Sequence, residues 1–150
     1  MKAVVQRVRG AQVTVNGVIS GKIDHGLLVY LGVALDDTED DVRHLAKKIA
    51  FLRVFDDGEG RMNLSVLDIG GSVLAVSQFT LLADTRRGRR PGYSRAAPPE
   101  QAGKLYDLFI TEIKAFNLPC EAGVFRSHML VSYTNDGPVT IIIDSKEPES

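Results

Sequence analysis

The sequence predicts an α/β fold in which mixed, curled β-structure is covered on one side by two helices. Many short segments are apolar, or alternate between apolar and polar residues as strands do, whereas only two segments carry apolar residues at helical spacing. Two helices are too few to cover both faces of a doubly wound sheet. The 150 residues suit a single domain over 1–150, and the chain shows no repeat and no linker.

The first predicted elements form a hairpin. Residues 2–9 and 11–15 are rich in β-branched side chains, and Asn16-Gly17 is typical of a two-residue turn, so residues 18–23 should return antiparallel. Residues 27–34 form a continuous apolar run, which predicts a strand buried on both faces.

The two predicted helices have clear ends. Thr38 can cap the first, and the turn residues at 56–60 predict that it stops near Val54. Its apolar positions are Val42, Leu45, Ile49 and Leu52. The second opens at Pro98-Pro99-Glu100 and ends at Asn117-Leu118-Pro119. Its apolar positions are Ala102, Leu105, Leu108, Phe109, Ile113 and Phe116.

The remaining apolar segments predict further extended structure. They are a short extended piece at 64–69, a second buried strand at 72–82, and strands at 121–125, 128–134 and 139–144. Residues 145–150 are polar and predict a flexible tail.

Composition excludes several classes of protein. The chain is 44% apolar and 25% charged, and its apolar runs are too short to span a bilayer. Its one cysteine, Cys120, excludes an internal disulfide and has no flanking base, so we expect an inert thiol. His25, His44 and His128 are not spaced to share a metal. Charged residues interrupt the N-terminal segment too early for it to be a signal peptide. We therefore expect a cytoplasmic protein without metal, cofactor or membrane partner.

Positive charge is concentrated in one segment. The net charge is −1, yet residues 85–95 contain five arginines and no acidic residue, so the rest of the chain is acidic. Such a segment can bind phosphate groups, or it can be a solvated surface loop.

Polar residues interrupt two segments that should belong to the core. In Ser77-Gln78-Phe79-Thr80-Leu81 they fall within a predicted buried strand, where they either bond across the sheet or line a site. Asn135-Asp136-Gly137-Pro138-Val139-Thr140 separates two predicted strands. Its Gly137-Pro138 bond is an ordinary turn, or a cis bond that presents carbonyl groups in an unusual direction.

These two segments resemble the two signature motifs of the D-aminoacyl-tRNA deacylases, also called D-tyrosyl-tRNA deacylases, of the bacterial and eukaryotic type. The resemblance covers essentially the whole chain. Three further matches fall in family order: residues 3–8, residues 62–65, and Gly88-Arg89-Arg90-Pro91 followed by Ala97-Pro98-Pro99.

The resemblance implies a three-layer α/β/β fold in a homodimer, with two active sites at the subunit interface. Ser77, Gln78, Phe79 and Thr80 of one subunit would form the floor of the pocket. The Gly137-Pro138 pair of the other subunit, in the cis form, would aim its carbonyl oxygens where an L-amino acid carries its side chain. D-amino acids and glycine would be accepted. Arg7, Asn135 and Met129 would support the site.

The expected reaction needs little side-chain chemistry. The substrate is an activated ester on the ribose of the terminal adenosine, and the neighbouring 2′-hydroxyl can assist the attacking water. The backbone N–H groups of Phe79 and Thr80 are candidates to stabilise the oxyanion. In a rival mechanism, Thr80 is a covalent nucleophile, although no base is evident beside it.

The rest of the expected site would bind tRNA. Arg86, Arg87, Arg89 and Arg90 are candidate phosphate contacts. In the 123–129 segment, near the pocket for the terminal adenine, Ser127 is small enough to leave the pocket open. Arg126 stands where the family usually has a small residue.

Two other functions remain open on the sequence. One is a non-catalytic RNA-binding protein of the same fold, and the other is a small-molecule esterase that never meets tRNA.

Overall fold

A five-stranded mixed sheet forms the centre of the molecule in the computed structural model, which describes residues 1–148. Its strand order is β6-β5-β2-β1-β7. β1 pairs antiparallel with β2 and with β7, whereas β5 runs parallel to β2 and to β6. The strands are β1 (Lys2–Val15), β2 (Val18–Gly32), β5 (Ser72–Ser77), β6 (Cys120–Ala122) and β7 (Leu130–Asp144). β3 (Phe55–Asp56) and β4 (Met62–Leu64) form a small separate sheet.

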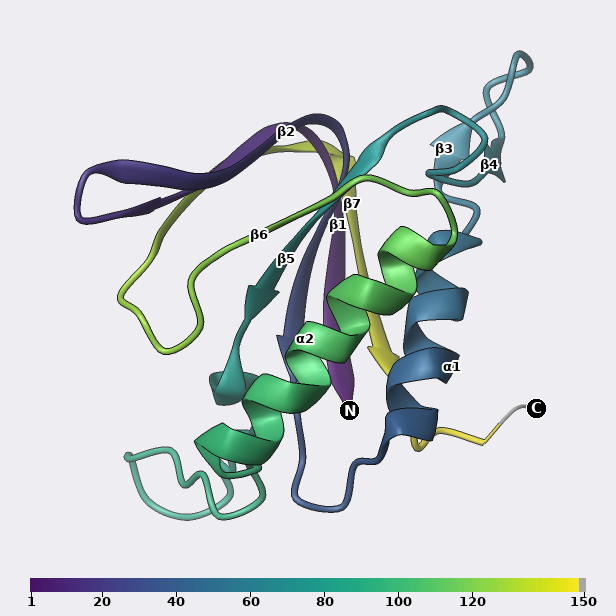
Figure 1. Cartoon of the computed structure of the whole chain (residues 1–150). Coiled ribbons are helices and arrows are strands. Elements are labelled where there is room, and N and C mark those ends of the chain that lie inside the picture. The colour runs from purple at the N-terminus through teal and green to yellow at the C-terminus, as the bar shows by residue number, and fades with distance from the viewer. Residues whose placement is uncertain (149–150) are drawn as a thin grey trace.

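Both helices cover the same face of this sheet (Figure 1). They are α1 (Glu39–Ala50) and α2 (Pro99–Ala115), and they pack against each other. Their apolar sides meet Leu27, Val29 and Leu31 of β2 in the main core. Leu28 of the same strand belongs to a second apolar cluster on the other face. The strand is therefore buried on both faces, as predicted, and the α/β class with two helices and a mixed sheet is confirmed.

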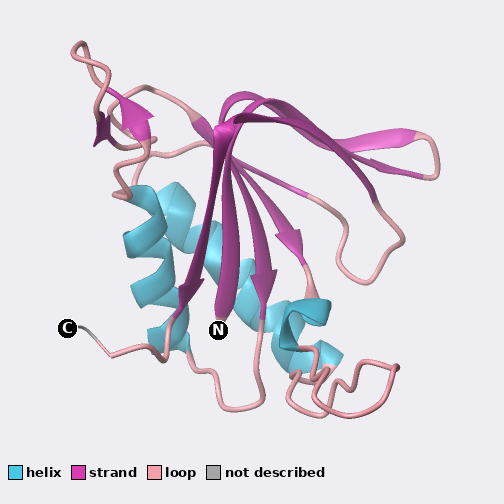
Figure 2. Ribbon diagram, turned by 180° about the vertical axis from the view of Figure 1, so that it is seen from behind, coloured by secondary structure: helices cyan, strands magenta, loops and turns pink. Residues whose placement is uncertain are grey.

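The sheet curls at one end. Beyond its middle, the β1–β2 hairpin and the first half of β7 bend away from the helices (Figure 2). The second cluster, which includes Val8, Val13 and Leu74, fills the inside of this bend. The flat end of the same face is left open, and Ile142 of β7, opposite Val4 of β1, is 74% exposed there. β7 is an edge strand of the sheet, so this exposed apolar side chain lies near the border of the open face.

Several predicted boundaries were wrong. The extended segment at 64–69 is mostly a turn after β4, because Ser65 and Asp68 bond each other's backbone N–H groups at 2.8 and 3.2 Å. The strand at 72–82 stops at Ser77, and the chain continues as a 3₁₀ turn, η1 (Phe79–Leu82). The strand at 121–125 ends at Ala122, and the first helix ends at Ala50. The segments 128–134 and 139–144 belong to one strand, β7.

The predicted flexible tail is fixed at its start. The Ser145 hydroxyl donates to Asp41 Oδ1 at 2.8 Å, and Lys146 Nζ donates to Asp41 Oδ2 at 3.0 Å. The Ser145 N–H donates to the Met1 carbonyl at 2.8 Å. Residues 149 and 150 of the predicted tail lie outside the described part of the chain. In residues 1–148, no helix is long and apolar enough to cross a membrane.

Asp41 should contribute stability that depends on pH. Burial opposes its ionisation, but hydrogen bonds from the Thr38 N–H, Ser145 and Lys146 outweigh burial and hold the pKa of Asp41 well below its usual value. A carboxyl whose pKa falls on folding stabilises the protein above its unfolded pKa, and this stability is lost as the pH falls. We expect Asp41→Asn to lower the free energy of unfolding by about 2 kcal/mol at pH 7, and by progressively less as the pH drops below about 4.

Denaturant unfolding across this pH range measures the effect. Asp40→Asn is the control, because the Asp40 side chain is 96% exposed and its 3.6 Å contact with Arg43 is a surface ion pair of little worth. Equal losses for Asp41→Asn at pH 7 and at pH 3 would contradict this account of the carboxylate.

Candidate functional site

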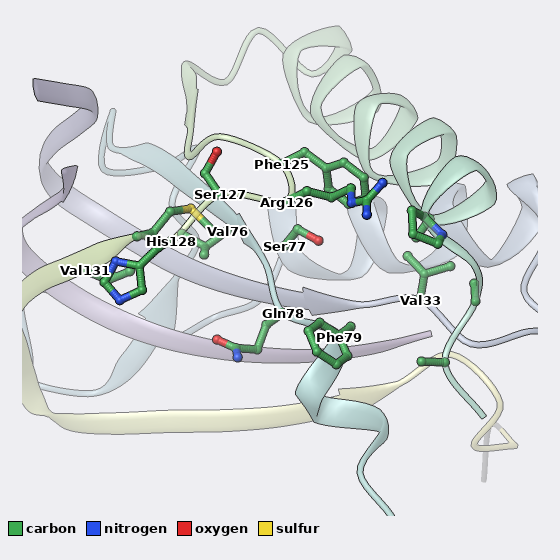
Figure 3. Close-up of a pocket in the computed structure, with 15 residues that line it drawn as sticks. Val33, Val76, Ser77, Gln78, Phe79, Phe125, Arg126, Ser127, His128 and Val131 are labelled. Atoms are coloured by element: carbon green, nitrogen blue, oxygen red, sulfur yellow. The ribbon is translucent and has the colours of Figure 1, made fainter. Parts of the chain in front are cut away.

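A cavity of about 630 Å³ lies beside the point where β5 leaves the sheet. Ser77, Gln78 and Phe79 line one side of it, and the segment after β6 lines the other (Figure 3). The first residues of α2 close a third side, where Ala102 is small enough to leave room. The cavity volume is in the range of sites that hold small ligands.

The abrupt end of β5 creates two free backbone donors. Gln78 makes the last bond to the neighbouring strand, from its N–H to the Leu31 carbonyl at 2.8 Å, and its own carbonyl then accepts from the Leu81 N–H at 3.2 Å. The N–H groups of Phe79 and Thr80 begin the 3₁₀ turn, and neither has a backbone acceptor in residues 1–148. Free donors at the first positions of a turn can bind an oxyanion.

Thr80 is held in place by its neighbour. The Gln78 side-chain amide donates to the Thr80 hydroxyl oxygen. Ser77, Gln78 and Phe79 line the cavity, whereas Thr80 is not among its lining residues. In residues 1–148, no histidine or carboxylate hydrogen-bonds to the Thr80 or Ser77 hydroxyl, so neither has a base in place to activate it.

The arginine-rich segment is a loop between η1 and α2, closed at its base by paired backbone bonds between Asp84 and Gly92 of 2.8 and 2.9 Å. Arg86 is already paired, because two of its nitrogens donate to the Asp84 carboxylate at 2.8 and 2.6 Å. These bonds hold the pKa of Asp84 well below its usual value. The other three candidate phosphate contacts, Arg87, Arg89 and Arg90, are exposed and form no ion pair within the described residues.

Tyr93 joins this loop to the cavity and was missed by the sequence reasoning. Its ring meets that of Phe79 edge to face, with 5.0 Å between the centroids. Phe79 is 56% exposed and Tyr93 is 38% exposed. The signal available in the sequence was an aromatic residue within an otherwise polar, arginine-rich loop.

The opposite wall is fixed by aromatic packing against α2. Phe125 stacks on Tyr106 with 6.0 Å between the ring centroids, and a Cβ on Gly103 would lie 3.1 Å from the Phe125 ring. Ser127 and Met129 follow on the same segment and line the cavity. Cys120 lies at the start of this region, and burial raises the pKa of its thiol to about 12. The thiol is therefore protonated at neutral pH, as expected for an inert cysteine.

A second group of predicted residues gathers around Arg7. The Gly137-Pro138 peptide bond is cis. Between the pairs Gln6–Thr140 and Val8–Asn135, four residues of β7, 136–139, stand opposite Arg7 alone, so they bulge out of the ladder. The Asn135 side chain accepts from the Val139 N–H at 3.1 Å and thereby closes the bulge.

Arg7 packs against this bulge and hydrogen-bonds to it. Arg7 is 9% exposed, and its guanidinium donates to the Asp136 carbonyl at 3.0 Å and to the Val54 carbonyl at 2.7 Å. Gly137 has a φ of +134°, and an added Cβ would lie 3.1 Å from the Arg7 guanidinium. The bulge therefore packs directly on the arginine and leaves no room for a side chain at Gly137.

One chain does not bring the two groups together. Ser77 of β5 lies in register with Leu31 and Ala3, whereas Arg7 of β1 is in register with Leu27. The bulge opposite Arg7 belongs to β7, on the far side of β1 from β5. β5 and β7 are three strand spacings apart, and the two motifs are offset by four residues along the strands. The motifs therefore lie roughly 20 Å apart. Gly137 and Pro138 do not line the cavity. Within residues 1–148, no three His, Cys, Asp or Glu side chains gather as metal ligands would.

Arg7 should be far less replaceable than Arg9, although both contact Asp136. Arg7 is buried and makes two bonds to carbonyl groups, whereas the Arg9 side chain is 70% exposed. The ammonium group of a lysine cannot reproduce the planar set of N–H donors that the guanidinium presents to these two carbonyl groups. We expect Arg7→Lys to cost about 2 kcal/mol of stability and Arg9→Lys less than about 0.5 kcal/mol, in urea unfolding. Equal effects of the two changes would show that the guanidinium does not hold the bulge.

Known proteins identify the family. The family model described as D-Tyr-tRNA(Tyr) deacylase matches residues 4–144. A D-aminoacyl-tRNA deacylase of Thermosipho africanus is 56% identical over 147 residues, which cover 98% of this chain and 99% of that protein. One of Koribacter versatilis is 57% identical with the same coverage.

Two solved structures share this fold. The c-Myc DNA unwinding element binding protein is 40% identical, with a TM-score of 0.91 over 99% of this chain and 100% of that one. A probable eukaryotic D-amino acid tRNA deacylase, 15% identical, shares the fold with a TM-score of 0.82 over 95% of this chain and 97% of its own. The chain belongs to the D-aminoacyl-tRNA deacylase family.

Proposed function

We propose that this protein hydrolyses the ester bond of D-aminoacyl-tRNA, and of mischarged glycyl-tRNA, to release the amino acid and free tRNA. The observation that carries the proposal is the pair of unbonded N–H groups at Phe79 and Thr80, beside a cavity and next to a cationic loop. Family membership and the names of the relatives support the same activity. Aminoacyl-tRNA is a cytoplasmic substrate, and we place the activity there.

The chemistry follows from those two donors. The ester carbonyl binds near Ser77, and the N–H groups of Phe79 and Thr80 stabilise the negative charge that develops on its oxygen. The adjacent ribose 2′-hydroxyl positions the attacking water. Thr80 as a covalent nucleophile is the less favoured route, because its hydroxyl is engaged by Gln78 and has no base beside it.

The remaining walls bind the nucleotide. The terminal adenosine packs against Phe125 and Met129, and Ser127 leaves space for it. The backbone phosphates of the tRNA meet Arg87, Arg89 and Arg90. Arg86 ranks behind these three as a phosphate contact because Asp84 already occupies its guanidinium.

The working unit is a homodimer. The open end of the sheet, where Ile142 is exposed, packs on its counterpart and completes the three-layer α/β/β arrangement. The cis Gly137-Pro138 bulge of one subunit then enters the cavity of the other, about 20 Å from its own cavity within the chain. Its carbonyl groups point to the position where an L-amino acid carries its side chain, and they repel that side chain. A D-amino acid or glycine has only a hydrogen atom at this position, so both are accepted.

Two rival functions predict different results. A non-catalytic RNA-binding protein would hold D- and L-aminoacyl-tRNA about equally and release neither amino acid. A small-molecule esterase would not depend on the arginine loop. The free donors beside the cavity favour catalysis over binding alone, and the loop favours tRNA over a small ester.

Release of tyrosine from D-tyrosyl-tRNA and L-tyrosyl-tRNA tests the proposal. We expect chelator-treated protein to hydrolyse the D form at least about 100-fold faster than the L form, since a clash with the carbonyl groups costs several kcal/mol. The rate at subsaturating substrate should fall as salt rises, because cationic side chains bind the phosphates.

Slow release from both substrates, with tRNA still bound, would leave only the RNA-binding function. Rapid but salt-independent release would instead indicate a small-molecule esterase.

A further inference from the structure

Arg126 occupies a backbone position that suits glycine far better than arginine. The Ser127 N–H donates to the Val124 carbonyl at 3.2 Å, so residues 124–127 form a tight turn in which Arg126 is the third residue. Its φ is +62°. The third residue of such a turn is usually Gly or Asn, because a Cβ is strained at positive φ. Nothing about the turn itself calls for an arginine here, and strained residues are often retained for function.

The position of the turn shows what the arginine can do. Phe125, the preceding residue, is anchored between Gly103 and Tyr106 of α2, so the turn cannot swing away from the cavity. The Arg126 side chain extends over the cavity, on the opposite side of Ser77 from Phe79 (Figure 3). It is exposed and forms no ion pair with any residue in 1–148. A free guanidinium is thus held at the rim, across the cavity from the arginine loop.

We propose that Arg126 binds the phosphodiester that joins the ester-bearing terminal nucleotide to the one before it. This assignment rests on the proposed function. With the terminal nucleoside in the cavity, its 5′-phosphate is the first anionic group outside the apolar walls. A guanidinium matches a phosphate with two parallel N–H donors. The arginine loop would contact the preceding phosphates, and Arg126 alone would fix the register of the terminal nucleotide.

Variants at Arg126 separate this role from backbone geometry. Arg126→Gly relieves the strained φ and removes the charge, whereas Arg126→Asn keeps a residue that tolerates positive φ and removes only the charge. Asn117→Gly is the matched control, because Asn117 also has a positive φ of 59°, is exposed, and lies at the end of α2 away from the cavity.

We expect both Arg126 variants to raise KM for D-tyrosyl-tRNA about fivefold to tenfold with little change in kcat, as loss of one charge-assisted contact does. The slope of the logarithm of binding affinity against the logarithm of salt concentration should become less steep by about 0.7 in these variants, the value for one single-stranded phosphate. Neither variant should lower the melting midpoint. Arg126→Lys should recover part of the affinity, and Asn117→Gly should match wild type throughout.

A substrate without the phosphate makes the test specific. The D-tyrosyl ester of adenosine has no 5′-phosphate, so wild type and the Arg126 variants should hydrolyse it with equal KM. An unchanged KM for D-tyrosyl-tRNA in both variants would overturn the assignment while the wild-type activity stands. A rise in KM that persists on the adenosine ester would also overturn it. A wild-type protein inactive on D-tyrosyl-tRNA would overturn the proposed function and this assignment together.

Discussion

One buried guanidinium holds the irregular part of β7 in place. Arg7 lies within β1, where its donors bridge the Val54 carbonyl after α1 and the Asp136 carbonyl of β7. Four residues of β7 stand opposite this single residue, and a bulge of that size needs internal support because its own ladder bonds are lost. Arg7 supplies that support and fixes the direction in which the cis Gly137-Pro138 bond leaves the sheet. The hydrogen bond from the Val139 N–H to the Asn135 side chain closes the bulge on its other side.

A second constraint acts on the cavity itself. The parallel strand β5 ends at Ser77, so the next two N–H groups are not used by the sheet and are available for a ligand. The helices on one face and the curl of the sheet on the other hold this strand end rigidly. Rigid donors matter because electrostatic stabilisation costs little reorganisation when the dipoles are already in place. The two constraints lie roughly 20 Å apart in one chain, and the proposed dimer is what joins them.

Much of the fold could be predicted because its signals are local. The Asn16-Gly17 turn, the buried run of β2 and the starts of both helices follow from short patterns, and all are present. The end of β5 at Ser77 could not be placed, because apolar residues continue as far as Leu82 and only the tertiary bond from Gln78 to Leu31 decides where the ladder stops. The resemblance drew attention to Gly137-Pro138 and Arg7, but the four-residue bulge that joins them depends on pairing between distant strands. Tyr93 was missed for the same reason, since its partner Phe79 lies across a long loop.

Mixing two inactive variants tests most directly whether two chains build one site. Phe79→Pro removes one oxyanion donor at a turn position that accepts proline. Pro138→Trp puts a bulky ring on the bulge that, in the proposed dimer, enters the partner's cavity, so it should block that cavity. Each variant alone should be nearly inactive on D-tyrosyl-tRNA. When the two are unfolded and refolded together, half the dimers should be mixed and carry one intact site of two, which restores about a quarter of wild-type activity. A mixture no more active than the two variants measured separately would contradict a site shared between subunits.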